Sequence, residues 1–351
     1  MPESEKIYQQ RKFKIKIITR NAIIRIAVAA AILTLAVLWA YNIMIKSPGK
    51  SYSGPLPPLT EDQIALRGRL MADVGNLALK IGERNIYQPK NLAAAAEFIE
   101  SSLTKAGCSV TRQTYTVDDV PCSNLEVKIA GTKHPDQIVI IGSHYDSVYG
   151  CPGANDNATA VAANLALARH FADKNPDLTL RFLFFVNEEP PFFQTPDMGS
   201  TVYAKKCKDN NENIVAMLSL ETLGYYSDQP NSQKYPLPLT LFYPSTADFI
   251  AFVSNPSSRK LLHRVVSTFR QNCKFPSESG AIPSFLAGIA WSDHYSFWQQ
   301  GYPALMVTDT APFRYPYYHE PGDTVDKINF DNLARVTTGL KAVINELTTS
   351  K

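Results

Sequence analysis

Hydrophobic and polar positions divide the chain into two kinds of segment. Residues 23–45 form one apolar run that only Arg25 interrupts, close to its start. From Thr60 onward, segments with apolar residues at helical spacing alternate with short apolar runs rich in β-branched and aromatic residues. This alternation is typical of an α/β fold, in which helices pack on a central sheet.

The spacing of the apolar residues also predicts individual elements. It predicts helices over residues 61–81, 90–106 and 158–171. It predicts strands over residues 124–130, 137–141, 178–186 and 214–220. The run at 178–186, LTLRFLFFV, has almost no polar residues, so we expect a central strand covered on both faces. A short turn-rich loop joins 124–130 to 137–141, so we expect these two strands to form an antiparallel hairpin.

The N-terminal apolar run is long enough to cross the ~30 Å hydrocarbon layer of a membrane as a helix. Basic residues are dense before the run and sparse after it, which places the N-terminus in the cytoplasm and the rest of the chain in the periplasm or outside the cell. A cleaved signal peptide and a buried core helix are the alternatives. We expect four segments, namely a basic cytoplasmic arm at 1–21, a transmembrane anchor at 22–45, a proline-rich tether at 46–59 and one folded domain at 60–351.

Composition narrows the possible partners. The chain is 45% hydrophobic and 19% charged, as expected for a folded protein. Its net charge is only +3, and much of the basic excess precedes residue 26, which argues against binding to nucleic acid. Nothing in the sequence indicates an oligomeric state.

Acidic residues and a histidine follow three of the predicted strands directly. The strand sequences end as IVIIGSHYD, FLFFVNEE and VAMLSLE. In open α/β sheets, ligand sites form at the carboxyl ends of the strands. We therefore expect His144, Glu188, Glu189 and Glu221 to lie at one edge of the sheet.

These residue types suit zinc-dependent hydrolysis. Catalytic zinc takes nitrogen and oxygen ligands and keeps a position for water, and two zinc ions can hold one hydroxide between them. Such a pair of ions needs roughly five protein ligands, with a further carboxylate, here Glu188, left for proton transfer. The candidate ligands are His144, Asp156, Glu189, Glu221 and His319.

Six motifs occur in order along the chain: HYDSV, PGANDNATA, NEE, LETLGYYS, SDHYSFW and YYHEPGDT. Together they resemble the zinc aminopeptidase family typified by aminopeptidase Y and the bacterial leucyl aminopeptidases. The resemblance extends from about Glu61 to the C-terminus. It implies a mixed, mostly parallel central β-sheet with helices on both faces, two zinc ions as cofactors and peptides as substrates.

The resemblance also implies a role for each candidate ligand. Asp156 would bridge the two metals, His144 and Glu221 would complete one site, and Glu189 with His319 would complete the other. The family usually has aspartate where this chain has Glu221, so this side chain must reach one methylene further.

Three other carboxylates would assist these ligands. Glu188 would be the general base, which takes a proton from water and returns it to the leaving amine. Asp146 would accept the ring proton of His144 and fix its tautomer. Asp323 would support His319 in the same way.

Other positions leave alternatives open. Phe192 and Phe193, in a segment longer than is usual for the family, could line a substrate pocket with Tyr317 and Tyr318, or could only pack their own loop. His294 is a candidate donor to the developing oxyanion.

Other functions also compete with aminopeptidase activity. Glutaminyl cyclases resemble this fold, and transferrin receptors are relatives that serve as binding domains without activity. The complete set of ligands and base favours an active hydrolase. Carboxypeptidase or dipeptidase specificity stays open.

The five cysteines lack the spacing of a zinc cluster. The predicted hairpin would bring Cys122 and Cys151 to its open end, so we expect a disulfide between them, with two free thiols as the alternative.

Overall fold

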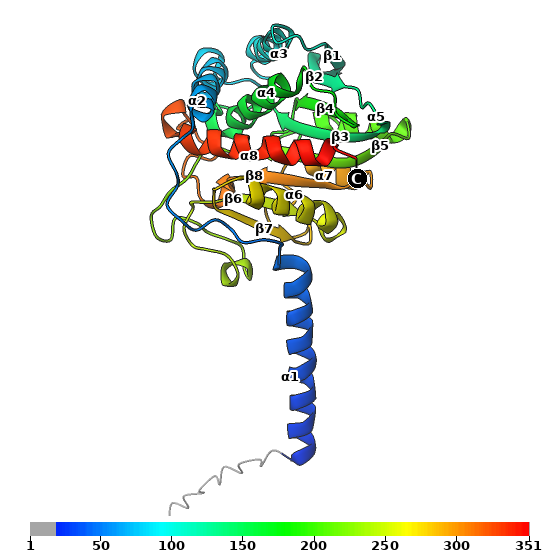
Figure 1. The fold of residues 1–351 in the computed structure, drawn as a ribbon, viewed down its shortest axis with the longest axis vertical. Coiled ribbons are helices and arrows are strands. Elements are labelled where there is room, and N and C mark those ends of the chain that lie inside the picture. The colour runs from blue at the N-terminus through cyan, green and yellow to red at the C-terminus, as the bar shows by residue number, and fades with distance from the viewer. Residues whose placement is uncertain (1–18, 351) are drawn as a thin grey trace, which may run out of the picture. The chain divides into compact units, whose positions relative to one another are not determined.

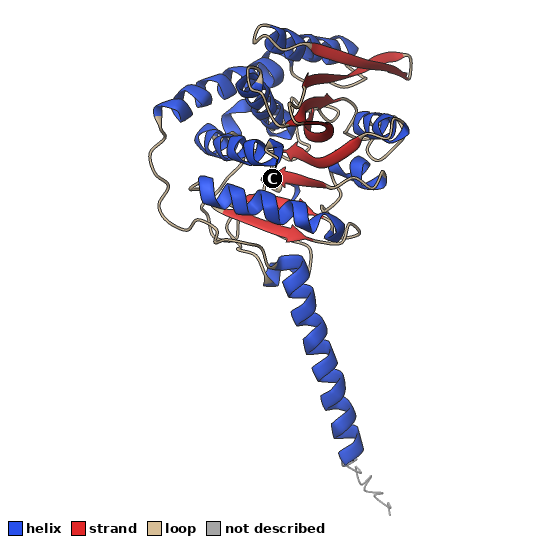
Figure 2. Cartoon of the chain, turned by 45° about the vertical axis from the view of Figure 1, so that its right-hand side comes forward, coloured by secondary structure: helices blue, strands red, loops and turns tan. Residues whose placement is uncertain are grey.

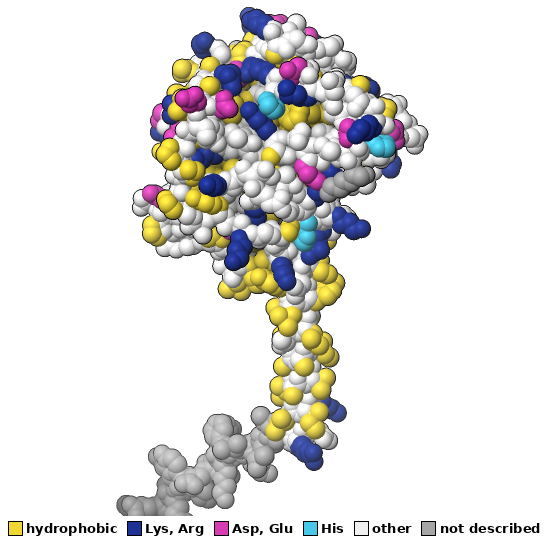
Figure 3. Space-filling model, in the orientation of Figure 1, with side chains coloured by type: hydrophobic (Ala, Val, Ile, Leu, Met, Phe, Trp, Pro, Cys, Tyr) yellow, Lys and Arg dark blue, Asp and Glu magenta, His cyan; other side chains and the backbone are white. Residues whose placement is uncertain are grey.

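The computed structural model describes residues 19–350, which form two compact units that divide between Ile43 and Met44. The first contains helix α1 (Arg20–Ala40), in which no residue is buried. Hydrophobic side chains cover the visible face of this helix (Figure 3). Residues Arg20–Ile45 form one helix long and apolar enough to cross a membrane, a property that a signal sequence shares. Most of the predicted basic arm, residues 1–18, lies outside the described residues.

The second unit is built on one eight-stranded sheet. Its strands are β1 (Val110–Val117), β2 (Val120–Ile129), β3 (His134–His144), β4 (Leu178–Phe185), β5 (Asn213–Glu221), β6 (Ile250–Ser254), β7 (Ser277–Ala281) and β8 (Ala304–Thr308). The order across the sheet is β1-β2-β4-β3-β5-β8-β6-β7. The neighbours β3/β4, β3/β5, β5/β8 and β6/β7 run parallel, and the other three pairs run antiparallel. The predicted mixed, mostly parallel sheet is confirmed.

Helices cover both faces of this sheet (Figures 1 and 2). The helices of this unit are α2 (Glu61–Val74), α3 (Pro89–Thr104), α4 (Ala160–Phe171), α5 (Gly199–Asp209), α6 (Arg259–Asn272), α7 (His294–Gln299) and α8 (Phe330–Thr348). Helices α2, α3, α4, α6 and α8 contribute to one hydrophobic core, and α5 and α7 contribute to a smaller core on the opposite face. The predicted helices at 61–81, 90–106 and 158–171 correspond to α2 with its π-helical extension Gly75–Ile81, to α3 and to α4.

The strand β3 shows why the central strands are apolar throughout. Val139 and Ile141 belong to the larger core, whereas Ile138 and Ile140 belong to the smaller one. Successive side chains of a strand point to opposite faces, so a strand with a core on each side has no position for a solvated residue. Every residue of β4 is likewise buried, as its sequence predicts.

The predicted hairpin between residues 124–130 and 137–141 is wrong. Strand β4 lies between β2 and β3, and β2 forms its hairpin with β1 instead. The connection after β2 crosses the start of β4, where Gly131 lies so close to the backbone of Leu178 that a Cβ atom would come within 2.6 Å of it. A strand that is apolar on both faces is stabilised most at an interior position, and β4 occupies one.

The disulfide predicted from that hairpin is also wrong. All five cysteines are buried and free. The Cys122 thiol accepts a hydrogen bond of 3.2 Å from the side-chain amide of Asn187. The premise fails because β4 separates the two strands that were expected to hold Cys122 and Cys151 together.

Candidate metal centre

The candidate ligands meet at the carboxyl edge of the sheet. His144 is the last residue of β3, Glu221 is the last residue of β5, and Glu189 follows β4. Asp156 lies in the π-helical turn Ala154–Thr159 that precedes α4, and His319 lies in the turns that follow β8. Strand register therefore fixes three of the five candidate ligands, and two loops supply the others.

Asp156 lies between the two histidines. Its Oδ1 atom is 3.3 Å from His144 Nε2, and its Oδ2 atom is 3.3 Å from His319 Nε2. Glu221 Oε2 is 3.3 Å from His144 Nε2, and Glu189 Oε2 is 3.1 Å from His319 Nε2. The side chains thus form two groups of three that share one carboxylate.

The chemistry of these donors fits bound cations. His144 Nε2, Asp156 Oδ1, Glu189 Oε1 and His319 Nε2 are buried without a hydrogen-bond partner in the described chain. Donor atoms of His144, Asp156 and Glu189 lie within 4.8 Å of one another. Unpaired buried polar atoms are costly, and a divalent metal with nitrogen and oxygen ligands would satisfy them together.

The acids also perturb one another. Burial raises the pKa of Glu189 to about 7, an effect that Asp156 increases and His319 opposes. Burial likewise raises the pKa of Glu221 to about 7, although His144 opposes the change. Positive charge is therefore needed here to keep these carboxylates ionised.

Asp146 holds the ends of two neighbouring strands together. Its carboxylate accepts hydrogen bonds from the backbone N–H groups of Glu188 and Glu189, at 3.2 and 3.1 Å, and lies 3.4 Å from His144 Nδ1. Glu188 Oε2 is 3.8 Å from His144 Nε2, at the side of the ligand group. Asp146 thus fixes both the histidine ring and the turn that carries the two glutamates.

Asp323 supports the Asp156 loop and has no hydrogen bond to His319, which differs from the expectation. Its carboxylate accepts hydrogen bonds from the backbone N–H groups of Asn155 and Asp156, at 2.8 and 3.0 Å, and from the Tyr315 hydroxyl at 2.8 Å. These contacts orient the shared carboxylate of Asp156.

Arg84, which sequence reasoning missed, is a buried cation beside the site. Its guanidinium donates hydrogen bonds to the carbonyl oxygens of Tyr145, at 2.6 Å, of Pro152, and of Gly153, at 2.8 Å. It joins the segment after His144 to the segment before Asp156. A single arginine carries no sequence signal of this kind, because its acceptors are backbone atoms.

Three other side chains complete the surroundings of the site. The Ser292 hydroxyl donates a 2.8 Å hydrogen bond to Glu221 Oε2, which holds the longer glutamate in place. The ring of Tyr318 stacks on His319, with ring centroids 3.9 Å apart. His294 is fully buried, its Nε2 atom is 2.8 Å from the Ile289 carbonyl oxygen, and it does not line the pocket described next.

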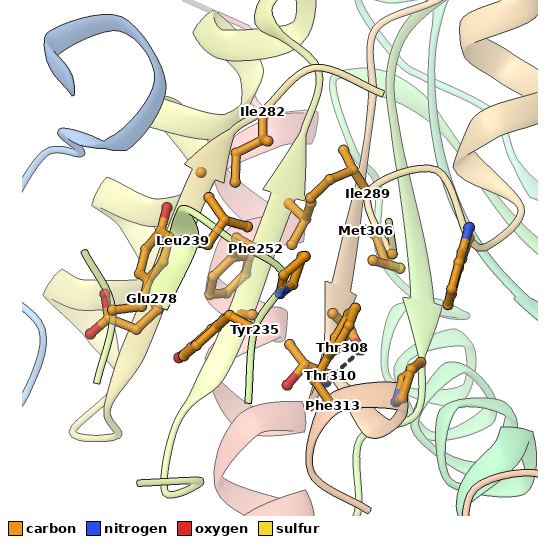
Figure 4. Close-up of a pocket in the computed structure, with 18 of the residues that line it drawn as sticks. Tyr235, Leu239, Phe252, Glu278, Ile282, Ile289, Met306, Thr308, Thr310 and Phe313 are labelled. Atoms are coloured by element: carbon orange, nitrogen blue, oxygen red, sulfur yellow. Dashed lines mark hydrogen bonds between the residues drawn. The ribbon is translucent and has the colours of Figure 1, made fainter. Parts of the chain in front are cut away.

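A pocket of about 750 Å³, open to solvent, begins at Glu221 and Tyr318 and extends over β8, β6 and β7. Its lining is mainly aromatic and aliphatic, with Phe252, Ile282 and Ile289 among the residues that Figure 4 labels. Of the four aromatic residues considered from the sequence, only Tyr318 lines it. Phe192 packs against the larger core instead.

Comparison with known proteins agrees with this geometry. Residues 124–344 match Peptidase family M28. The chain belongs to this family. It is 36% identical over 281 residues to the uncharacterized protein YfbL of Escherichia coli, covering 78% of this chain and 85% of that protein. It is 26% identical over 281 residues to a probable aminopeptidase of Saccharomyces cerevisiae, covering 74% and 68% of the two chains.

Solved structures share the fold of this M28 peptidase. A zinc aminopeptidase from Bacillus subtilis superposes with a TM-score of 0.65 at 14% identity, covering 81% of this chain and 95% of that one. A glutaminyl cyclase from Fimbriiglobus ruber superposes with a TM-score of 0.59 at 18% identity, covering 86% and 99%. The chain is thus a metallopeptidase of a zinc-dependent family, on a fold that also carries cyclase chemistry.

The role of Arg84 predicts a large loss of stability when its charge is removed. Arg84→Met should lower the free energy of unfolding by about 3 kcal/mol or more, because several buried carbonyl groups lose their donor at about 1–3 kcal/mol each. Arg67→Met is the control, since Arg67 is partly exposed and its ion pair with Asp331 lies at the surface, so its loss should be below about 1 kcal/mol. Denaturant unfolding followed by tryptophan fluorescence measures both, and equal losses would contradict the assignment.

Proposed function

We propose that this M28 peptidase is an aminopeptidase that uses two zinc ions and a glutamate general base. The main support is the position of Asp156, whose two carboxylate oxygens face two different histidines. A carboxylate in this position is suited to bridging two metals. The names of the aminopeptidase relatives support the choice of substrate.

The two groups of side chains would hold one ion each. His144 and Glu221 would bind the first ion, Glu189 and His319 would bind the second, and Asp156 would contact both. Bound zinc ions would supply Lewis acidity and lower the pKa of a water molecule. Peptide would reach the site from the solvent side of the pocket, which begins at Glu221.

Glu188 is positioned for proton transfer. It lies beside the ligand group, at 3.8 Å from His144 Nε2. Burial raises its pKa, Glu221 and Glu189 raise it further, and His144 opposes the change. Glu188 would take the proton of the attacking water and pass it to the leaving amine. The Tyr318 hydroxyl is our candidate for the donor to the developing oxyanion, because Tyr318 lines the pocket together with Glu221 and its ring stacks on His319.

We further propose that α1 anchors the chain in a membrane, with residues 1–21 in the cytoplasm and the peptidase domain, 60–351, in the periplasm or outside the cell. The basic residues before the apolar run support this orientation. Residues 46–59 would connect the two parts. Within this segment, Ser51 contacts the edge strand β7, where its Oγ atom accepts a 2.8 Å hydrogen bond from the Ser277 backbone N–H.

The shared carboxylate predicts a metal content of close to two zinc ions per chain. The full-length protein, purified in detergent and dialysed, should contain that amount by atomic emission spectrometry and should lose activity to a chelator. Asp156→Ala should reduce the binding of both ions together. A content of one ion, with Asp156→Ala unchanged, would contradict the bridging role.

Glu188→Gln tests the general base. This variant should keep the zinc content of the wild type and lose about 10²–10⁴-fold in kcat, the range expected for general base catalysis. Glu320→Gln is the control, because Glu320 is exposed and next to His319 in sequence. It should stay within about threefold of the wild type. Full activity of Glu188→Gln would show that the role is wrongly assigned.

A panel of substrates tests the aminopeptidase proposal itself. Aminoacyl anilides with a free amino group should be hydrolysed, whereas the same compounds with an acetylated amino group should not. Equal rates on both would point to endopeptidase or carboxypeptidase action. A peptide with N-terminal glutamine is included because of the cyclase neighbour. Conversion of that glutamine to an N-terminal pyroglutamyl residue, with loss of ammonia and no cleavage of the peptide bond, would replace the proposal with cyclase activity.

A further inference from the structure

The register of the sheet connects the metal centre to a second carboxylate. Glu221 on β5 pairs with Thr308 on β8, Thr308 pairs with Ala251 on β6, and Ala251 pairs with Glu278 on β7. Residues paired directly across neighbouring strands project from the same face of a sheet. Three strand spacings separate Glu221 from Glu278, which is about 14 Å between Cα atoms. All four residues line the same pocket.

Glu278 lies at the end of this pocket that is remote from the metal centre. Figure 4 shows it beside Tyr235 and Leu239, on the opposite side from Met306. Its side chain is half-buried and makes no hydrogen bond or ion pair in the described part of the chain. A carboxylate in such a place is costly unless a cation or a donor meets it.

Arg270 is the cation whose charge acts on Glu278, but its hydrogen bonds go to other groups. Arg270 donates its hydrogen bonds to the Ser277 hydroxyl and carbonyl, at 3.1 and 2.8 Å, and to the carbonyl oxygens of Pro48 and Gly49. Its charge only opposes the rise in the pKa of Glu278 that burial causes. The carboxylate is therefore available to a ligand in the pocket.

The wall between the two carboxylates suits an apolar stem with a positive end. Leu239, Ile282 and Ile289 supply apolar surface along the pocket. Tyr235 and Tyr243 lie near Glu278, with ring centroids 5.7 Å apart, and aromatic faces attract cations. An extended lysine or arginine side chain reaches about 6–7 Å beyond its Cα atom. With its Cα atom beside the metal centre, its charged end would come within reach of Glu278.

We propose that Glu278 selects peptides whose N-terminal residue is lysine or arginine. The stem of that side chain packs on the apolar wall, and its charge pairs with the Glu278 carboxylate. A shorter apolar side chain would leave the carboxylate unpaired and would bind less well. This inference rests on the proposed aminopeptidase function and specifies its substrates.

The test compares side chains of nearly equal shape and different charge. The full-length protein in detergent is assayed with arginyl and citrullinyl anilides, and with lysyl and norleucyl anilides. The wild type should show a kcat/KM ratio of about 10–100 for each charged compound over its neutral counterpart, as expected for a charge-assisted hydrogen bond. In Glu278→Gln this ratio should fall to between about 1 and 3.

A matched variant controls for the general effect of negative charge. Asp248 is exposed and does not line the pocket, although its charge acts on Glu278. Asp248→Asn should keep the ratio of the wild type within about twofold. Because the readout is a ratio between two substrates, a general loss of activity or of folded protein in any variant cancels.

The outcomes separate the inference from the proposed function. The inference is overturned if the kcat/KM ratio of charged to neutral substrates is near 1 in the wild type, or if Glu278→Gln leaves this ratio unchanged. Either result leaves the aminopeptidase proposal in place. If no free-amino substrate is hydrolysed, the proposed function fails. The affinities of free arginine and citrulline, measured by calorimetry, then test the pocket alone. Tighter binding of arginine that Glu278→Gln abolishes supports the charge pairing. Equal affinities for the two amino acids overturn it.

Discussion

The accumulation of buried carboxylates at one edge of the sheet is the constraint on which the rest of this structure depends. The acids that are buried there include Asp146, Asp156, Glu188, Glu189, Glu221, Asp293, Asp309 and Asp323. Like charges this close cannot all ionise without compensation, because burial removes the screening of water. The described part of the chain supplies the Arg84 guanidinium, and the unpaired ring nitrogens of the two histidines fit a bound metal, which would add positive charge.

The surrounding fold distributes these acids between two tasks. Asp146 and Asp323 accept hydrogen bonds from backbone N–H groups of the segments that carry the candidate ligands, so these two carboxylates position those segments. Asp156, Glu189 and Glu221 direct their oxygens toward the histidines. This division explains why the ligands sit on strand ends and short turns, where hydrogen bonds to the backbone restrict their motion.

The same edge connects chemistry to recognition. Strands β8, β6 and β7 continue the row of paired residues that begins at Glu221, so the pocket and the candidate metal centre lie on one continuous sheet. A side chain bound over these strands is therefore positioned relative to the ligands by the register of the sheet. If the pocket binds substrate as proposed, its selectivity would depend on which residues the far strands place along that row.

The sequence by itself determined the α/β class, the central position of β4 and the chemical identity of the candidate ligands. These properties are local, because apolar runs and the acids that end them are contiguous in the chain. Carboxylates that directly follow buried strands must meet at one edge wherever parallel strands are adjacent. The positions of His144, Glu189 and Glu221 could therefore be expected before the fold was known.

Only the tertiary structure decided which strands are neighbours. The short loop between β2 and β3 suggested a hairpin, yet β4 separates the two strands, because burying an apolar strand on both faces outweighs the preference for local pairing. Arg84 and Ser292 contact the site across long sequence separations, and strand pairing places Glu278 in the adjoining pocket. Their partners include backbone atoms and paired strands, which leave no pattern in the sequence. Such contacts arise from packing, which no local pattern encodes.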